Sequence, residues 1–197
     1  MKKALVYIHG KGGNAEECEH YRPLFPDCDV IGFDYHAQTP WEAQAEFPAY
    51  FNELCRDYDS VSIIANSIGA YFALNSLCDI PLEKAYFISP VADMEKLICT
   101  MLSWAGVTEA ELQEKGTIET DFGDTLSLEY LRWVREHPFS WHTPSVILYG
   151  QRDNLQSRET ICEFAERINA ALTVMETGEH WFHTPEQMAF LDNWISK

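Results

Sequence analysis

Six short apolar runs recur along the chain, separated by longer segments with helical spacing. Most of these runs are almost continuously apolar rather than alternating, which is typical of strands buried on both faces. Strands that alternate with helices form a parallel sheet covered by helices on both sides. The sequence therefore predicts an α/β fold with a mostly parallel six-stranded sheet, whose strands cover Ala4–Ile8, Asp29–Tyr35, Ser60–Ala65, Lys84–Ile88, Ser145–Tyr149 and Leu172–Glu176.

The 197 residues suffice for one domain with a sizeable core, which we place at residues 1–197. No apolar run approaches the roughly 20 residues that span a bilayer, and the start of the chain lacks the apolar region and cleavage site of a signal peptide. The net charge of −17 argues against nucleic acids and anionic membranes as partners, because both bind basic surfaces. We expect a cytoplasmic protein with neither partner.

Six cysteines are scattered along the chain without the C-x-x-C spacing of a zinc site or a redox pair. In a chain of this size they are typical of free thiols, buried or half-buried. The sequence therefore predicts no disulfide framework and no metal, and its cysteines are Cys18, Cys28, Cys55, Cys78, Cys99 and Cys162.

Helices are expected between the predicted strands and after the last one. Pro48 lies inside one of them and either kinks it or marks a restart. The last helix opens at Thr184 with a capping box, in which Pro185 is the first helical residue and Gln187 the third. The predicted helices of the sheet region cover Asn14–Leu24, Trp41–Tyr58, Ile68–Leu77, Thr160–Ala170 and the segment that begins at Thr184.

One connection is much longer than the dozen residues that a crossover needs. No strand is expected between Pro90 and Pro144, and the segment reads as two or three helices, including Met94–Trp104 and Ser127–Glu136, with a capping box at Thr108. We interpret residues 92–142 as a helical lid over the end of the sheet; the alternative is that its apolar residues only form its own small core. These residues are Met101, Leu102, Trp104, Phe122, Leu131, Trp133 and Trp141.

A serine lies between the third predicted strand and the helix that follows it. Ser67 is flanked two positions away by the small residues Ala65 and Gly69. This is the setting of a nucleophile elbow, G-x-S-x-G, in which a sharp turn exposes the serine and tolerates only small neighbours. Alanine replaces the first glycine, so the stretch alone does not establish a nucleophile.

Three other strand ends carry residues that complete such a site. His9-Gly10-Lys11-Gly12-Gly13 follows the first strand, Asp153 follows the fifth and His180 follows the sixth. Ligands bind at the carboxyl ends of strands in open parallel sheets, so these residues meet on one rim with Ser67. The order serine, aspartate, histidine is that of α/β-hydrolases.

Over nearly its whole length the chain resembles a small α/β-hydrolase-fold serine hydrolase, similar to carboxylesterases. The motifs are HG-x-G-G, the elbow, L-Y-G-x-x-D, G-x-H and a terminal helix. The departures are Ala65 in the elbow and the absence of two strands that usually precede the H-G strand. The resemblance implies a trimmed six-stranded sheet and a metal-free, cofactor-free enzyme.

The chemistry assigns a role to each motif. Ser67 is the nucleophile, His180 the base that removes its proton, and Asp153 the acid that orients the imidazole. The residue after the nucleophile, Ile68, supplies one backbone N–H to the oxyanion. By resemblance, Lys11 supplies the other.

Other residues compete for two of these roles. His183 lies three residues beyond His180 and is an alternative base, although the G-x-H pattern favours His180. Asp93 follows the fourth strand and is an alternative acid. Asp34 and Asp124 are expected to be ordinary surface or structural carboxylates.

Two hypotheses of other classes stay open. Gly10 to Ala15 matches G-x-G-x-x-G/A after a first strand, with Asp34 about 20 residues on, which is the fingerprint of dinucleotide-binding Rossmann proteins. Pro23 argues against it, because a Rossmann helix runs longer. The chain could also be a catalytically inactive hydrolase fold that serves as a binding module.

The favoured hypothesis is a carboxylesterase that cleaves a small-molecule ester through an acyl-enzyme. Thioesterase and amidase activity stay open, because the same triad serves all three, and so does the oligomeric state. Aromatic residues of the lid and beside His180 point to an apolar part of the substrate, and the expected substrate-binding residues are Trp104, Trp133 and Trp181.

Overall fold

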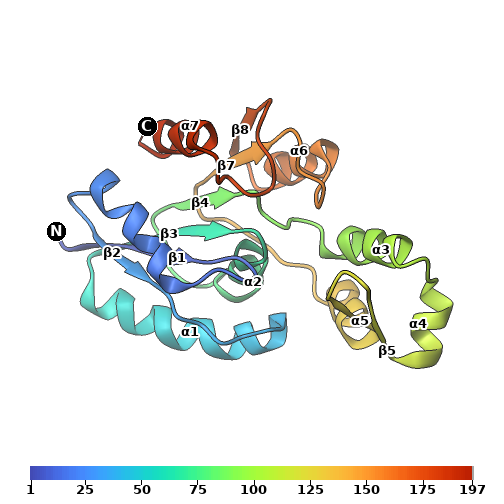
Figure 1. Ribbon diagram of the computed structural model, residues 1–197. Helices are drawn as coiled ribbons and strands as arrows, with labels where there is room; N and C mark the ends of the chain where they lie inside the picture. The colour runs from blue at the N-terminus through green and yellow to red at the C-terminus, as the bar shows by residue number, and fades with distance from the viewer. Residues whose placement is uncertain (197) are drawn as a thin grey trace. The chain divides into compact units, whose positions relative to one another are not determined.

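The computed structural model describes residues 1–196 (Figure 1). These residues form two compact units. The sheet unit comprises residues 1–92 and 140–196, and the inserted unit comprises residues 93–139. The inserted unit nearly coincides with the segment predicted as a lid; its role as a lid stays a prediction.

A six-stranded sheet forms the centre of the sheet unit, and all of its neighbouring strands run parallel. The strand order is β2-β1-β3-β4-β7-β8. The predicted six strands are confirmed, with β2 three residues shorter than expected because the chain leaves the sheet after Gly32. Their bounds are β1 Lys3–Ile8, β2 Asp29–Gly32, β3 Ser60–Asn66, β4 Ala85–Ile88, β7 Ser145–Gly150 and β8 Ala171–Met175.

The helices of the sheet unit match the expected ones except the first. The segment predicted as one helix over Asn14–Leu24 consists of two short 3₁₀ helices, because Pro23 cannot continue a helix and instead stands at the start of the second. Pro48 does not mark a restart, since α1 runs through it. The helices are η1 Ala15–His20, η2 Arg22–Leu24, α1 Pro40–Asp57, α2 Ile68–Ser76, α6 Arg158–Arg167 and α7 Pro185–Ile195.

Each face of the sheet carries its own layer of apolar side chains. On one face, Tyr7, Ile64 and Ile88 of the strands form a core with Leu191 and Trp194 of α7. On the other face, Phe87 of β4 packs with a tilted ring against Phe164 of α6 at 6.1 Å between ring centroids. The near-continuous apolar runs of the sequence are explained by this burial from both sides.

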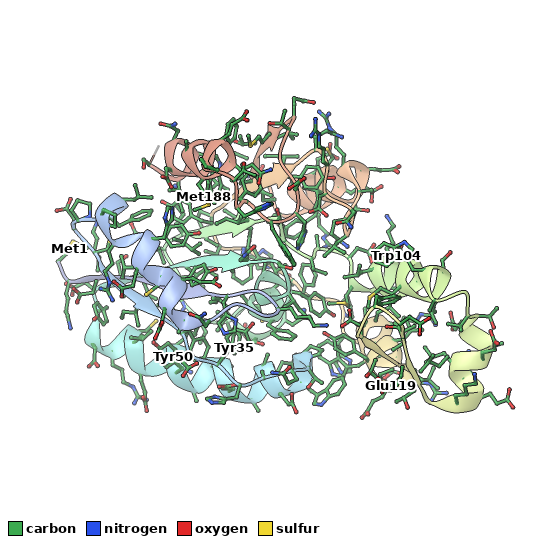
Figure 2. All side chains as sticks on the ribbon, in the orientation of Figure 1. Met1, Tyr35, Tyr50, Trp104, Glu119 and Met188 are labelled. Carbon is green, nitrogen blue, oxygen red and sulfur yellow. The ribbon has the colours of Figure 1, made fainter. Side chains whose placement is uncertain are left out.

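An aromatic cluster joins α1 to the strand ends of this second face. Phe33 stacks on Tyr50 at 4.2 Å between ring centroids and meets Phe47 edge-on at 4.9 Å. Tyr35, which Figure 2 labels, also packs against Phe47, with 5.2 Å between ring centroids. Phe33 and Tyr35, which follow β2, are therefore core residues, which is why the apolar run that predicted the strand continues past its end.

The inserted unit is not wholly helical, so the expectation of no strand between Pro90 and Pro144 is wrong. Two three-residue strands pair as an antiparallel hairpin. Its turn is closed by the Thr120 hydroxyl, which donates to the Asp124 carbonyl, and Gly123 supplies a φ of 85°. Strands this short carry no readable alternation. The elements are α3 Met94–Trp104, α4 Glu109–Lys115, β5 Thr117–Glu119, β6 Thr125–Ser127 and α5 Leu128–Glu136.

The apolar residues of the predicted lid divide between several environments. Leu102 and Leu131 are buried, whereas Trp104 and Phe122 are 49% and 43% exposed and meet edge to face (Figure 2 labels Trp104). Trp141 does not belong to the inserted unit: it packs on Phe87 in the sheet unit, and its indole N–H donates to Ser145 Oγ at 2.9 Å. Its assignment to the lid is therefore wrong.

Two further expectations concern the surface. Cys78 and Cys99 are exposed rather than buried or half-buried. No helix within residues 1–196 combines the length and the apolar character needed to cross a membrane.

Candidate active site

Ser67 stands on a strained turn between β3 and α2. Its φ of 52° and ψ of −120° lie outside the regions that L residues favour. The turn is held from both sides, because the Ser67 N–H donates to the Ile88 carbonyl and the Val91 N–H donates to the Ser67 carbonyl, each at 3.1 Å. Strain that the surroundings enforce in this way is typical of functional sites.

The two small residues of the elbow are not equally constrained. A Cβ on Gly69 would lie 2.3 Å from the His9 carbonyl oxygen and 2.9 Å from that of Ile8, so no side chain fits there. Ala65 is fully buried in β3, paired with Ile8 on one side and Phe87 on the other. The structure thus accommodates the extra methyl at the first position and forbids one at the second.

Ser67, His180 and Asp153 form one hydrogen-bonded chain. Ser67 Oγ lies 2.8 Å from His180 Nε2, and His180 Nδ1 lies 2.7 Å from Asp153 Oδ2. The side chains of His180 and Asp153 are 6% and 0% exposed. Burial removes competing water, so the hydrogen bonds fix the orientation of the imidazole.

Two glycines let the acid and histidine loops interlock. A Cβ on Gly150 would lie 2.5 Å from the carbonyl carbon of Gly178, and one on Gly178 would lie 2.9 Å from Gly150 Cα. The Arg152 N–H donates to the Gly178 carbonyl at 2.8 Å across this contact. The two loops that carry Asp153 and His180 are therefore locked together through their backbones.

The second carboxylate oxygen of Asp153 is held by its own loop. Asp153 Oδ1 accepts from the N–H groups of Leu155 and Gln156, at 2.7 and 3.1 Å, which leaves Oδ2 to the histidine. The Tyr149 hydroxyl donates to the Gln156 carbonyl at 2.9 Å. Burial, and then the charge of Asp153, raise the pKa of Tyr149 to about 12, so the hydroxyl remains a donor at neutral pH.

The Gln156 side chain extends this loop to the strand end beside it. Its Oε1 accepts from the Ala92 N–H at 3.0 Å, and its Nε2 donates to the Leu155 carbonyl at 3.1 Å. Sequence reasoning missed this residue. The sequence itself offered only an amide side chain three positions after the acid, and its burial became visible in the structure.

The glycine loop after β1 lies against the serine. A Cβ on Gly10 would come within 3.1 Å of Ser67 Cβ. The loop is braced by His9, whose ring stacks on Tyr35 at 4.2 Å and whose carbonyl accepts from the Tyr35 hydroxyl at 2.8 Å. Ile68 is the first residue of α2, where backbone N–H groups lack a partner within the helix. The oxyanion roles of Ile68 and Lys11 stay predictions.

A second anchor of the glycine loop was not recognised in the sequence. The Tyr7 hydroxyl donates to Glu17 Oε2 at 2.6 Å, and Glu17 Oε1 accepts from the Asn14 N–H at 3.3 Å. Burial raises the pKa of Tyr7 far above its usual value, so it stays protonated. The spacing Asn14 to Glu17, a capping box, was the available signal.

This anchor also argues against the dinucleotide hypothesis. The loop leads into a 3₁₀ helix of six residues, and the Asn14 N–H already donates a hydrogen bond to the Glu17 carboxylate. A pyrophosphate needs free N–H groups and a longer helix at this place, whereas here it would meet a negative charge.

The competing residues make other contacts. His183 is exposed, and its Nδ1 contacts the Trp181 carbonyl at 2.7 Å. Asp93 caps α3 by accepting from the Lys96 N–H at 2.8 Å. Asp34 is exposed, and Asp124 lies in the turn of the inserted unit's hairpin.

The three tryptophans expected to bind substrate belong to two different units. Trp181 follows His180 and is 70% exposed. Trp133 stacks on His137 at 4.4 Å within the inserted unit, which also carries Trp104. Their role in binding stays a prediction.

Solved structures of hydrolases share this fold. α/β Hydrolase domain-containing protein 10 from mouse is similar with a TM-score of 0.79 and 14% identity, covering 98% of this chain and 87% of its own. Est1E from Butyrivibrio proteoclasticus is similar with a TM-score of 0.77 and 15% identity, and the match covers 99% of this chain and 86% of Est1E. An esterase from Exiguobacterium antarcticum is similar with a TM-score of 0.65 and 14% identity, and the match covers 100% of this chain and 91% of the esterase. No protein-family model and no curated protein matches the sequence.

Proposed function

We propose that this protein, whose chain has the α/β-hydrolase fold, is a serine hydrolase that cleaves carboxylic esters. The observation that carries the proposal is the hydrogen-bonded chain from Ser67 Oγ through His180 to Asp153, at 2.8 and 2.7 Å. The strained turn at Ser67 supports it, because strain that the surroundings enforce is typical of functional sites. A small-molecule ester would be the partner.

The proposed reaction has two halves. His180 Nε2 takes the hydroxyl proton of Ser67 while Oγ attacks the ester carbonyl, and the oxyanion is held by the N–H groups of Ile68 and Lys11. The C–O bond to the alcohol breaks as His180 returns the proton to the leaving alkoxide. Water, deprotonated by His180, then attacks the acyl-enzyme and releases the acid and free Ser67.

Asp153 would act through the histidine rather than on the substrate. With Oδ2 at 2.7 Å from His180 Nδ1, the carboxylate selects the tautomer in which Nε2 can accept a proton. It also stabilises the imidazolium formed in each half-reaction. The hydrogen bonds to Oδ1 keep the carboxylate in this orientation.

A labelling experiment separates this proposal from an inactive binding module. We expect a fluorophosphonate probe to label the folded protein at Ser67, and p-nitrophenyl esters to be hydrolysed. A folded protein that shows neither labelling nor turnover would leave the binding module as the better hypothesis. Thioester and amide analogues of the best ester decide between the three reactions that the triad permits.

An acyl-chain series tests the expected apolar substrate part. We expect acetyl to octanoyl p-nitrophenyl esters to be cleaved in preference to esters with a charged acyl group. Methyl ferulate belongs in the series, because Est1E has been solved with ferulic acid bound. A preference for strongly charged acyl groups would contradict the apolar pocket but not the triad.

Paired variants test the choice of acid and base. Asp153→Asn is expected to lower kcat by about 10⁴-fold, since the amide favours the wrong histidine tautomer. Asp93→Asn, at the cap of α3, is its matched control and is expected to leave kcat unchanged. His180→Ala and His183→Ala form the second pair, with the same contrast. A larger loss of kcat in Asp93→Asn than in Asp153→Asn would reassign the acid. A larger loss of kcat in His183→Ala than in His180→Ala would reassign the base.

A further inference from the structure

The loop that carries His180 lies between β8 and α7 and is exposed on both sides of the histidine. Thr177, Glu179, Trp181 and His183 are exposed, whereas His180 is 6% exposed. Before the histidine, Gly178 is tied to the acid loop by the Arg152 N–H. A separate device must hold the chain after it.

The Gln187 side chain occupies that place. It lies in the first turn of α7 and is 4% exposed. Its Oε1 accepts from the His183 N–H at 3.1 Å, and its Nε2 donates to the Thr177 carbonyl at 3.5 Å. One buried amide thus joins the residue three before His180 to the residue three after it.

This arrangement differs from the capping box that the sequence predicts. In that motif the side chain of the third helical residue would accept from the N–H of the cap, Thr184. Gln187 instead bonds the preceding residue, and the cap is made by the Gln187 N–H, which donates to Thr184 Oγ1 at 3.2 Å. The side chain is therefore available to the loop, and a substitution at position 187 leaves the cap itself intact.

We propose that Gln187 is a positioning residue for His180, which closes the histidine loop and so keeps Nε2 within reach of Ser67. The inference rests on the proposed function for its kinetic consequences, but not for its geometry. Without the amide, the His183 N–H loses its acceptor and the loop gains freedom on the side of the histidine that no glycine contact secures. A misplacement of about 1 Å can cost a catalyst about 100-fold in rate.

The variants Gln187→Met and Gln187→Glu separate the two hydrogen bonds. Methionine has a similar size and makes neither bond, and we expect kcat to fall about 10- to 100-fold with little change in KM. Glutamate keeps an acceptor for the His183 N–H, and we expect it to retain most of the activity. Thr184→Ala is the matched control, because it weakens the cap of the same helix and leaves the amide in place.

The kinetic comparison has two contradicting outcomes. A folded Gln187→Met protein with the kcat of the parent would overturn the proposal. So would a loss of kcat in Thr184→Ala equal to that in Gln187→Met, since the effect would then come from helix stability. Loss in Gln187→Met alone, with rescue by glutamate, supports it. If the methionine variant does not fold, the kcat values of Gln187→Glu and Thr184→Ala are compared instead. A lower kcat in Gln187→Glu than in Thr184→Ala would contradict the expected rescue.

A spectroscopic readout keeps this inference separate from the proposed function. In ¹⁵N-histidine-labelled protein, the ring N–H of His180 that faces Asp153 is assigned by its loss in His180→Gln. We expect its exchange with water to be at least about 10-fold faster in Gln187→Met than in the parent or in Thr184→Ala. Unchanged exchange contradicts the positioning role even in an inactive protein, whereas absent turnover in the parent contradicts only the hydrolase.

Discussion

Ser67→Ala is expected to abolish ester turnover, with kcat lowered by about 10⁴- to 10⁶-fold. Alanine has no Oγ, so no acyl-enzyme forms, and the water-mediated reaction that remains relies on the oxyanion donors alone. The fold should persist, because alanine tolerates the φ of 52° no worse than serine does. Initial rates on a short p-nitrophenyl ester and loss of fluorophosphonate labelling measure the effect.

Ser76→Ala is the matched control for this variant. Ser76 is also a buried serine of the same segment, at the far end of α2, and its Oγ has no hydrogen-bond partner within residues 1–196. Its removal should change neither turnover nor labelling. Retention of more than about 1% of the parental kcat in Ser67→Ala would contradict the nucleophile assignment, since covalent catalysis contributes far more than 100-fold.

Gly69→Ala is expected to be the most destabilising single-methyl addition in the elbow. The new Cβ would lie 2.3 Å from the carbonyl oxygen of His9, which follows β1, and 2.9 Å from that of Ile8, the last residue of β1. Relief requires α2 or the glycine loop to move, so we expect a loss of about 3 kcal/mol or more in the free energy of unfolding. Urea denaturation followed by circular dichroism measures it.

Ala65→Gly provides the comparison at the other elbow position. It restores the glycine of the usual motif, removes one buried methyl group and adds backbone freedom to β3. We expect a loss of about 1–2 kcal/mol in the free energy of unfolding and turnover close to that of the parent. If Ala65→Gly were the more destabilising of the two, the asymmetry that the structure assigns to the elbow would be wrong.

The two elbow positions show where a sequence pattern stops being informative. Both Ala65 and Gly69 satisfy the requirement for a small residue, and the pattern treats them alike. Only the packing distinguishes them, because the carbonyls of Ile8 and His9 face position 69 and come from the end of β1 and the residue after it, some 60 residues earlier in the chain. A local sequence motif does not show which distant residues pack against it.

Gln187 is a second position at which a sequence pattern does not predict the contacts of the side chain. Its spacing from Thr184 matches a capping box, and the predicted helix start is confirmed. The side chain nevertheless bonds His183 and Thr177, which suit it better once the histidine loop is folded against α7. Local spacing predicted the helix, and tertiary contacts decided what the side chain does.

The hairpin of the inserted unit was missed for a different reason. Strands of three residues, β5 and β6, are too short for alternation to appear. The capping box at Thr108, in contrast, is confirmed, because its donors and acceptors lie within four residues of each other. Local hydrogen bonding can be predicted from the sequence, whereas the pairing of such short strands cannot.

By itself the sequence determined the six strands, their parallel character and the residues that follow each strand, since burial on both faces requires continuous apolar runs and the rim residues come next along the chain. Only the tertiary structure decided that Ser67 meets a histidine 113 residues away, through loops interlocked at Gly150 and Gly178 and closed by Gln187. These contacts join distant segments, and their fit depends on tenths of an ångström between backbones, which no pattern of residue types specifies.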